Sequence, residues 1–201
     1  MNFQKYANNG WGLSRKALYE LYWIVRIGDR VLEFGSGKST EFLLDLNRDL
    51  QITSFDHDPS YAFKSDIVNI RPLVETSDYW VDYMFEKKEY NRTFMDLKVD
   101  KPSTRQRNCF YDLKPYDIHG IYDVVILDGP NGNGRSLAAL ILKDNLEKGS
   151  IVLIDDFRDY DFLDYFSIVF DFNILSMCSA GKRKQWNKGG DFVIIEINEK
   201  L

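Results

Sequence analysis

The sequence predicts a mainly parallel β-sheet with helices on both faces and one reversed strand. Short apolar runs of strand length alternate with helical patterns along most of the chain. Near the end, the runs Phe172–Met177 and Phe192–Ile197 are joined by a Gly- and Lys-rich connector with no room for a helix, so they should be antiparallel neighbours. Polar and glycine residues follow several of the apolar runs, as they do where a parallel sheet binds a ligand.

The first third of the chain predicts a helix followed by a βαβ unit. Ser14 suits the N-cap of a helix within 12–28, whose apolar residues recur at intervals of three and four. The run Arg30–Phe34 has the length and apolarity of a buried strand, and glycines separate it from a helical pattern over Ser39–Asn47. Gln51–Phe55 is the next β-type run, which completes a strand, helix, strand unit.

The remaining strands differ in their expected place in the sheet. Asn69–Val74 contains Pro72, which cannot donate a hydrogen bond to a strand ladder, so we expect this run at an edge. Residues 76–117 do not fit the alternation and are expected to hold helices that contribute to a substrate face. Further strands are expected at Tyr122–Leu127 and Ser150–Ile154, with a helix at about Ser136–Leu146 between them.

Composition limits the class of protein. With 201 residues, 44% of them hydrophobic, the chain suits one domain over 1–201 with a substantial core. The net charge of −5 argues against a chain-wide nucleic-acid footprint, so we do not expect nucleic acid as a partner. No apolar stretch reaches the length of a membrane span and the N-terminus lacks a signal-peptide pattern, so we expect a soluble cytoplasmic protein. The two cysteines form no disulfide or zinc motif.

Glycine and acidic residues follow four of the predicted strands, at the end where an open parallel sheet binds its ligands. Gly35 and Gly37 would let the backbone approach a ligand closely, and Asp56, about twenty residues further on, can accept hydrogen bonds from a ribose diol. The strand-end residues are Glu33, Gly35, Ser36 and Gly37 after the first strand, Asp56 after the second, Asp128 and Gly129 after Tyr122–Leu127, and Asp155 and Asp156 after Ser150–Ile154.

The motif GSGKST, which begins at Gly35, has competing interpretations. Thr40 stands where a dinucleotide-binding fingerprint requires a third glycine or alanine, which favours a nucleoside ligand without a bridging pyrophosphate. A phosphate-binding P-loop would need a glycine at position 32, where Leu32 stands inside the predicted strand. The sequence therefore favours nucleoside binding over nucleotide triphosphate hydrolysis.

Taken together, these motifs resemble the class I S-adenosylmethionine-dependent methyltransferases. VLEFGSG looks like the first motif of that family, SFDHD like its acidic second motif, and YDVVILDGP and KGSIVLIDD like its fourth and fifth strand ends. The resemblance covers about residues 12–198 and implies a Rossmann-like, seven-stranded sheet with an antiparallel last strand. DGPNGNGR and the later DDFRD resemble a branch of small O-methyltransferases that includes glycan-modifying members.

The resemblance also implies roles for individual residues. Asp128 matches the position that faces the cofactor sulfonium and the acceptor, which makes it the candidate general base. Metal-dependent members ligate a divalent cation at the corresponding strand ends, so Asp128, Asp155 and Asp156 are candidate ligands for Mg²⁺ or Mn²⁺. The family's cofactor-binding positions fall on Glu33, Gly35, Ser36 and Gly37 with Ser39 nearby for the methionine portion, on Asp56 for the ribose, and on His57 beside the adenine.

The basic connector before the last strand is a candidate acceptor site. Lys182, Arg183, Lys184 and Trp186 suit an anionic acceptor, although a solvated hairpin loop explains the same pattern. We expect O-methylation of a small-molecule or sugar acceptor with S-adenosylmethionine as the methyl donor. The alternatives are an RNA or protein methyltransferase and a non-catalytic nucleoside-binding protein on the same fold. The oligomeric state does not follow from the sequence.

Overall fold

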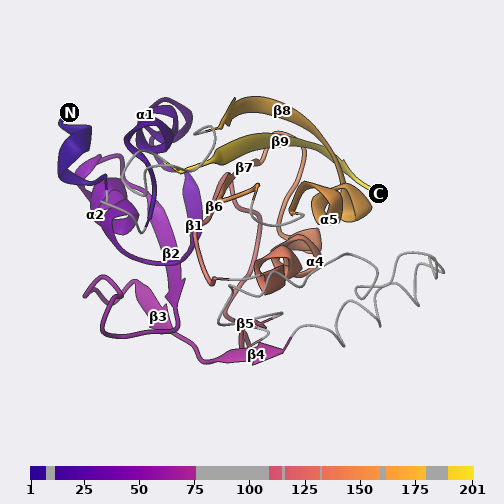
Figure 1. Ribbon diagram of the computed structural model, residues 1–201, viewed down its shortest axis with the longest axis horizontal. Helices are drawn as coiled ribbons and strands as arrows, with labels where there is room; N and C mark the ends of the chain where they lie inside the picture. Colours follow the sequence, from indigo (N-terminus) through magenta and orange to yellow (C-terminus); the bar gives the residue numbers. More distant parts are fainter. Residues whose placement is uncertain (8–11, 76–108, 115, 132, 159–161, 180–189) are drawn as a thin grey trace.

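A seven-stranded sheet forms the centre of the molecule (Figure 1). The computed structural model describes residues 1–7, 12–75, 109–114, 116–131, 133–158, 162–179 and 190–201. The strands lie in the order β3-β2-β1-β6-β7-β9-β8. Their bounds are β1 Arg30–Phe34, β2 Gln51–Asp56, β3 Val68–Ile70, β6 Val124–Leu127, β7 Ile151–Asp155, β8 Phe170–Cys178 and β9 Phe192–Lys200.

The strand directions confirm the predicted fold class. Neighbouring strands pair in parallel along the row β3, β2, β1, β6 and β7. In contrast, β9 is antiparallel to both of its neighbours, β7 and β8. The last strand is therefore reversed, as expected, and lies one place in from the edge. In the register of the sheet, Phe34 lies opposite Leu127, which lies opposite Ile154. Consequently the residues that follow these three strands meet at one rim of the sheet.

Helices cover both faces of the sheet (Figure 1). Alternating strand residues such as Val31 and Leu32 belong to two separate apolar clusters, one on each face. Among the described residues, no helix has the length and apolarity to cross a membrane. The first face carries η1 Phe3–Lys5, α1 Arg15–Ile24 and α2 Lys38–Asp45, and the second carries η2 Asn133–Leu137, α4 Ala138–Ile141, η3 Leu142–Asp144 and α5 Phe162–Val169.

The first helix is shorter than its predicted range of 12–28. Ser14 caps α1 as expected, because its side-chain oxygen accepts a hydrogen bond from the backbone N–H of Ala17 at 3.1 Å. The helix ends at Ile24 because Val25 has extended backbone angles. Beyond it, Gly28 adopts a φ of +84°, which a glycine allows and which turns the chain toward β1.

The predicted helix Ser136–Leu146 is also wrong as a regular helix, since this segment forms η2, α4 and η3 in succession. The buried guanidinium of Arg135 holds its start. The Nε of Arg135 donates to the carbonyl of Pro130 at 2.8 Å, and Nη1 donates to the carbonyl of Asp155 at 2.9 Å. These bonds hold the 3-10 turn of η2 against the chain that follows β6 and against the end of β7. The segment therefore starts as a tight turn and not as a regular α-helix.

The predicted strand Asn69–Val74 divides into two elements. β3 is an edge strand of the seven-stranded sheet, as expected. In contrast, β4 (Leu73–Glu75) pairs antiparallel with β5 (Cys109–Tyr111) in a separate two-stranded sheet. Pro72 lies at the break because it has no N–H for a ladder, and its carbonyl accepts from the N–H of Asp112 at 2.8 Å. Figure 1 shows β4 and β5 apart from the seven strands, and β5 contacts η2.

Candidate active site

The glycine loop after β1 lies in backbone contact with the loop after β6. Gly35 has a φ of +94°, and its N–H donates to the carbonyl of Phe55 at 2.8 Å. The N–H of Gly129 donates to the carbonyl of Phe34 at 2.7 Å. A Cβ added to Gly35 would lie 2.7 Å from the backbone nitrogen of Gly129, so only glycine fits at this junction.

Glu33 is buried beneath the glycine loop and receives hydroxyl hydrogen bonds. Its Oε2 accepts from Thr40 Oγ1 at 2.5 Å and from Ser54 Oγ at 2.6 Å. Thr40 Oγ1 in turn accepts from the N–H of Gly37 at 2.9 Å, which links the loop to the acid. The other oxygen, Oε1, has no hydrogen-bond partner among the described residues. Burial raises the pKa of Glu33 to about 7, while the hydroxyls of Ser39, Ser54 and Thr40 lower it.

Asp56 ends β2 and fixes the glycine loop from the other side. Its Oδ2 accepts from the N–H of Ser36 at 2.9 Å, and its Oδ1 accepts from the N–H groups of His57 and Asp58 at 2.7 and 3.0 Å. Two backbone donors use the acceptor capacity of Oδ1. The second donor of Oδ2 is the Ser36 hydroxyl at 3.5 Å, a long hydrogen bond that a ligand hydroxyl could replace. The structure thus brings together Glu33, the glycine loop and Asp56, as predicted.

Asp128 and Asp155 form a hydrogen-bonded carboxyl pair at the ends of β6 and β7. Burial raises the pKa of Asp128 to about 6, the charge of Arg135 lowers it, and the charge of Asp156 raises it. Burial and the neighbouring charge of Asp128 raise the pKa of Asp155 well above its ordinary value, and Asp155 therefore holds the proton of the pair. Asp128 is the member of the pair that is ionised first as the pH rises.

Sequence reasoning missed two residues of this site. Arg135 is fully buried and its charge acts on both Asp128 and Asp155. The glycine-rich stretch before it signals a turn, but a charged residue after a turn is usually exposed. Tyr111, at the end of β5, is buried with its ring stacked on Phe34 at 5.7 Å between centroids. Its only signal was its place within the segment that was expected to contribute to a substrate face.

The predicted metal ligands do not form a metal centre. Among the residues that the structure describes, no group of three or more His, Cys, Asp or Glu side chains is arranged to hold a metal ion. Asp155 is buried and hydrogen-bonded to Asp128, and Asp156 has a φ of +56° in the turn that follows. These three strand-end acids therefore do not gather as Mg²⁺ or Mn²⁺ ligands.

The predicted acceptor residues Lys182, Arg183, Lys184 and Trp186 lie outside the described residues. The chain is described again from Gly190, where a Cβ would lie 3.0 Å from Asp155 Oδ1. Gly190, the first described residue after the connector, therefore lies beside Asp155.

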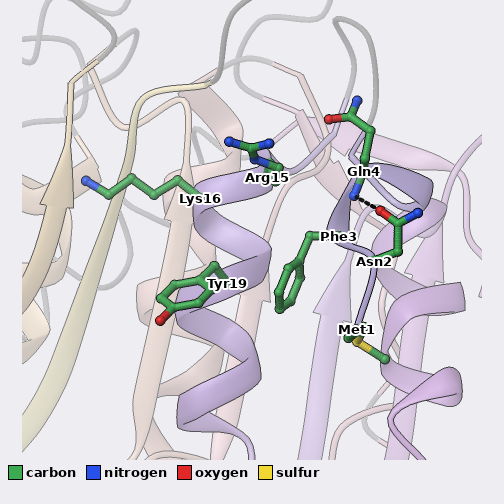
Figure 2. A pocket seen from close by; sticks show the side chains of 7 residues that line it. All are labelled: Met1, Asn2, Phe3, Gln4, Arg15, Lys16 and Tyr19. Carbon is green, nitrogen blue, oxygen red and sulfur yellow. Dashed lines mark hydrogen bonds between the residues drawn. The ribbon is translucent and has the colours of Figure 1, made fainter.

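A hollow of about 590 Å³ lies elsewhere, between η1 and α1 (Figure 2). Phe3 faces α1 and packs edge to face on Tyr19 at 5.7 Å between ring centroids, whereas the Lys16 side chain extends away from Phe3. The hollow contains none of the strand-end residues of the predicted cofactor site. Its lining residues are Met1, Asn2, Phe3, Gln4, Arg15, Lys16 and Tyr19.

Comparisons with known proteins identify the fold. No protein-family model matches the sequence, and no curated protein matches it. The precorrin-6y C5,15-methyltransferase of Geobacter metallireducens GS-15 is similar in structure, with a TM-score of 0.52 and 9% identity over 98% of this chain and 96% of that chain. The chain thus has the Rossmann-like fold that is found in methyltransferases.

Two further solved structures that are similar to this chain are named as RNA methylases. The tRNA m1G37 methyltransferase of M. jannaschii has a TM-score of 0.49 and 12% identity over 92% of this chain. An rRNA methylase from Streptococcus thermophilus has a TM-score of 0.49 and 14% identity over 92% of this chain and 96% of that chain. This chain spans 49% of the tRNA methyltransferase, about half of its length.

These neighbours correct the expectation about nucleic acid. The net charge led us to expect no nucleic-acid partner, and that expectation is wrong: tRNA and rRNA methylases stand among the similar structures, and net charge gives no ground for excluding such a partner. The physical reason is that a net charge summed over the chain does not report the charge of one face, such as that of a basic connector.

Proposed function

We propose that this chain is an S-adenosylmethionine-dependent methyltransferase. The observation that carries the proposal is the junction of two glycine loops between buried acids. Gly35 and Gly129 meet backbone to backbone, with Glu33 beneath the first loop and Asp56 beside it. This is the end of a parallel sheet where nucleosides bind.

The donor groups at this junction fit the cofactor. Glu33 Oε1 is a buried carboxylate oxygen without a hydrogen-bond partner among the described residues, and it suits the ammonium of a methionine portion. Asp56 Oδ2 could accept a hydrogen bond from a ribose hydroxyl in place of its long, 3.5 Å bond from Ser36 Oγ. The strand ends carry several carboxylates, and the buried cation among them is Arg135, so they favour a ligand with positive charge.

The residues of the rim supply orientation and a base. S-adenosylmethionine supplies an activated methyl group, and transfer breaks the sulfur–carbon bond, forms an oxygen–carbon bond and leaves the electron pair on sulfur. Asp128, ionised above about pH 6, accepts the proton that the acceptor hydroxyl releases. Asp155 donates its hydrogen bond to Asp128 and so orients that carboxylate. Positioning provides most of the acceleration, because the donor is already activated.

The acceptor in this proposal is a hydroxyl group of a small molecule or a sugar. The resemblance of DGPNGNGR to small O-methyltransferases supports it. The basic residues of the connector sequence, which ends where Gly190 lies beside Asp155, further support an acceptor that carries negative charge. An RNA acceptor is the alternative that the test must include.

Transfer of labelled methyl groups tests the proposal. The protein is incubated with methyl-labelled S-adenosylmethionine and with separate pools of small metabolites, glycans and RNA. We expect label in a metabolite or glycan fraction, and loss of at least tenfold in rate for Asp128→Asn. The matched control is Asp164→Asn on the exposed side of α5, which should keep the wild-type rate. Label in RNA alone would show that the acceptor is RNA and not a small molecule or sugar. Label in none of the pools would contradict the proposed methyltransferase activity.

A further inference from the structure

Tyr111 presents a buried hydroxyl to the candidate active site. Its ring lies on Phe34 with an interplanar angle of 17°, and its centroid is 6.3 Å from that of His57. The residue is 2% exposed, yet its hydroxyl oxygen has no hydrogen-bond partner among the described residues. A buried polar group that lacks a partner is uncommon and calls for an explanation.

The hydroxyl lies at the junction of the two glycine loops. A Cβ added to Gly129 would lie 2.6 Å from the Tyr111 hydroxyl oxygen and 2.9 Å from the Cα of Gly35. The ring of Tyr111 therefore faces Phe34 and the end of β2, while its oxygen reaches the backbone where β1 and β6 end. Any side chain at position 129 would displace this oxygen.

The surroundings keep the phenol neutral. Burial raises the pKa of Tyr111 well above its ordinary value, and the charges of Asp56, Asp128 and Glu33 raise it further. The positive charge of Arg135 lowers this pKa, but by less. The charges of all three predicted site acids thus act on this hydroxyl. A neutral phenol can donate one hydrogen bond and accept others, so it suits a ligand with both ammonium and carboxylate groups.

The local fold holds Tyr111 in this place. Arg71 follows β3 and forms two hydrogen bonds with the carboxylate of Asp117, at 2.5 and 2.8 Å. The N–H of Asp112 bonds to the carbonyl of Pro72. These contacts fasten the residues after Tyr111 to the end of β3, and the β4–β5 ladder holds Tyr111 opposite Leu73, so the hydroxyl is positioned before any ligand arrives.

We propose that the Tyr111 hydroxyl hydrogen-bonds to the methionine portion of S-adenosylmethionine. This inference rests on the proposed function, since it assigns a contact within the same cofactor site. The methionine portion is indicated because the oxygen lies over Gly35 and Gly129, whereas the nucleoside portion is assigned to Asp56 and His57.

Calorimetric titration of the intact protein with S-adenosylhomocysteine and with adenosine tests the assignment. Adenosine lacks the amino-acid portion of the first ligand. We expect Tyr111→Phe to weaken S-adenosylhomocysteine binding about tenfold, the effect of one lost hydrogen bond to a charged group, and to leave adenosine binding unchanged. The matched control is Tyr122→Phe, because the hydroxyl of Tyr122 is likewise buried and without a partner among the described residues, but Tyr122 precedes β6 at its opposite end.

Each outcome decides a separate point. Equal affinity of wild type and Tyr111→Phe for S-adenosylhomocysteine would overturn the assignment. An equal loss for both ligands would also overturn it, because the effect would then lie in the nucleoside portion or the fold. No binding of either ligand by the wild type would instead remove the proposed function, and the Tyr111 assignment with it. Thermal unfolding of the two variants should match, since each change removes only an unpartnered hydroxyl.

Discussion

The carboxyl groups of Asp128 and Asp155 are hydrogen-bonded to each other across the ends of two adjacent parallel strands, β6 and β7. Asp155 holds the shared proton because burial and the neighbouring charge of Asp128 both raise its pKa well above its ordinary value. This leaves Asp128 as the carboxylate that can accept a proton. The pair explains how two neighbouring acids can have different roles in one site.

The rate of methyl transfer should depend on the ionisation of Asp128. Since its pKa is about 6, the rate is expected to rise with pH through about 6 and to level off above it. Asp155→Ala removes the hydrogen bond that favours ionised Asp128, so the rise should move to higher pH. Asp155→Asn keeps an N–H donor, and its profile should stay near that of the wild type. Rate profiles with the acceptor found by labelling would measure this, and identical profiles for all three proteins would contradict the assigned hydrogen bond.

Glu33 should make the protein less stable as the pH rises. Burial raises its pKa from an ordinary 4.5 to about 7, so between these values the folded protein holds a proton that the unfolded chain has lost. The free energy of unfolding should therefore fall with pH across this window, by about 3 kcal/mol from this residue at ~1.4 kcal/mol per pKa unit. Glu33→Gln should be more stable than the wild type at pH 8 and should bind S-adenosylhomocysteine more weakly.

Urea unfolding at pH 4.5, 6 and 8 would measure the stability difference between wild type and Glu33→Gln. A difference that does not change with pH would show that the pKa of Glu33 is not raised in the folded protein.

Arg135 should be essential to the folded state. Its removal leaves the buried carboxyl groups of Asp128 and Asp155 without the cation that acts on both, and frees the carbonyls of Pro130 and Asp155. Arg135→Met, which keeps an unbranched side chain, should cost about 3–5 kcal/mol of unfolding free energy. Arg158→Met is the matched control, because Arg158 is exposed, and it should stay within about 0.5 kcal/mol of the wild type. Similar midpoints in chemical unfolding for the two variants would contradict the role of Arg135.

Gly35→Ala separates a steric clash from backbone strain. Gly35 and Gly149 have similar φ angles of +94° and +91°, so alanine is strained at both, by about 1 kcal/mol. Only at Gly35 would the added Cβ meet backbone, at 2.7 Å from Gly129 N, whereas nothing lies within 4 Å at Gly149. Gly35→Ala should therefore lose clearly more stability than Gly149→Ala, and should also lose S-adenosylhomocysteine binding. If Gly35→Ala and Gly149→Ala lowered the thermal unfolding temperature equally, backbone strain alone would explain the loss of stability at Gly35.

Much of the sheet could be predicted because buried parallel strands are short apolar runs. Tyr122–Leu127 and Ser150–Ile154 contain β6 and nearly all of β7, and the polar residues after them meet at the predicted rim. The break at Pro72 could not be predicted in the same way. A missing N–H shows that the chain cannot stay in a ladder there, but not that the next residues pair with β5, far along the chain.

The site could be predicted where its residues follow strands directly. Glu33, Asp56 and Asp128 lie where a strand ends, so the topology alone places them together. Arg135 and Tyr111 could not be predicted as site residues, because their positions depend on tertiary contacts. A buried guanidinium runs against the usual exposure of arginine, and a tyrosine in a three-residue strand of a separate two-stranded sheet carries no periodic signal.

Calorimetric titration with S-adenosylhomocysteine and with ATP tests the cofactor site most directly, using wild type, Asp56→Asn and the exposed-surface control Asp66→Asn. We predict micromolar binding of S-adenosylhomocysteine by the wild type and the control, at least tenfold weaker binding by Asp56→Asn, and no binding of ATP. Binding of ATP alone, or S-adenosylhomocysteine binding that Asp56→Asn leaves unchanged, would contradict a cofactor site formed by the glycine loop and Asp56.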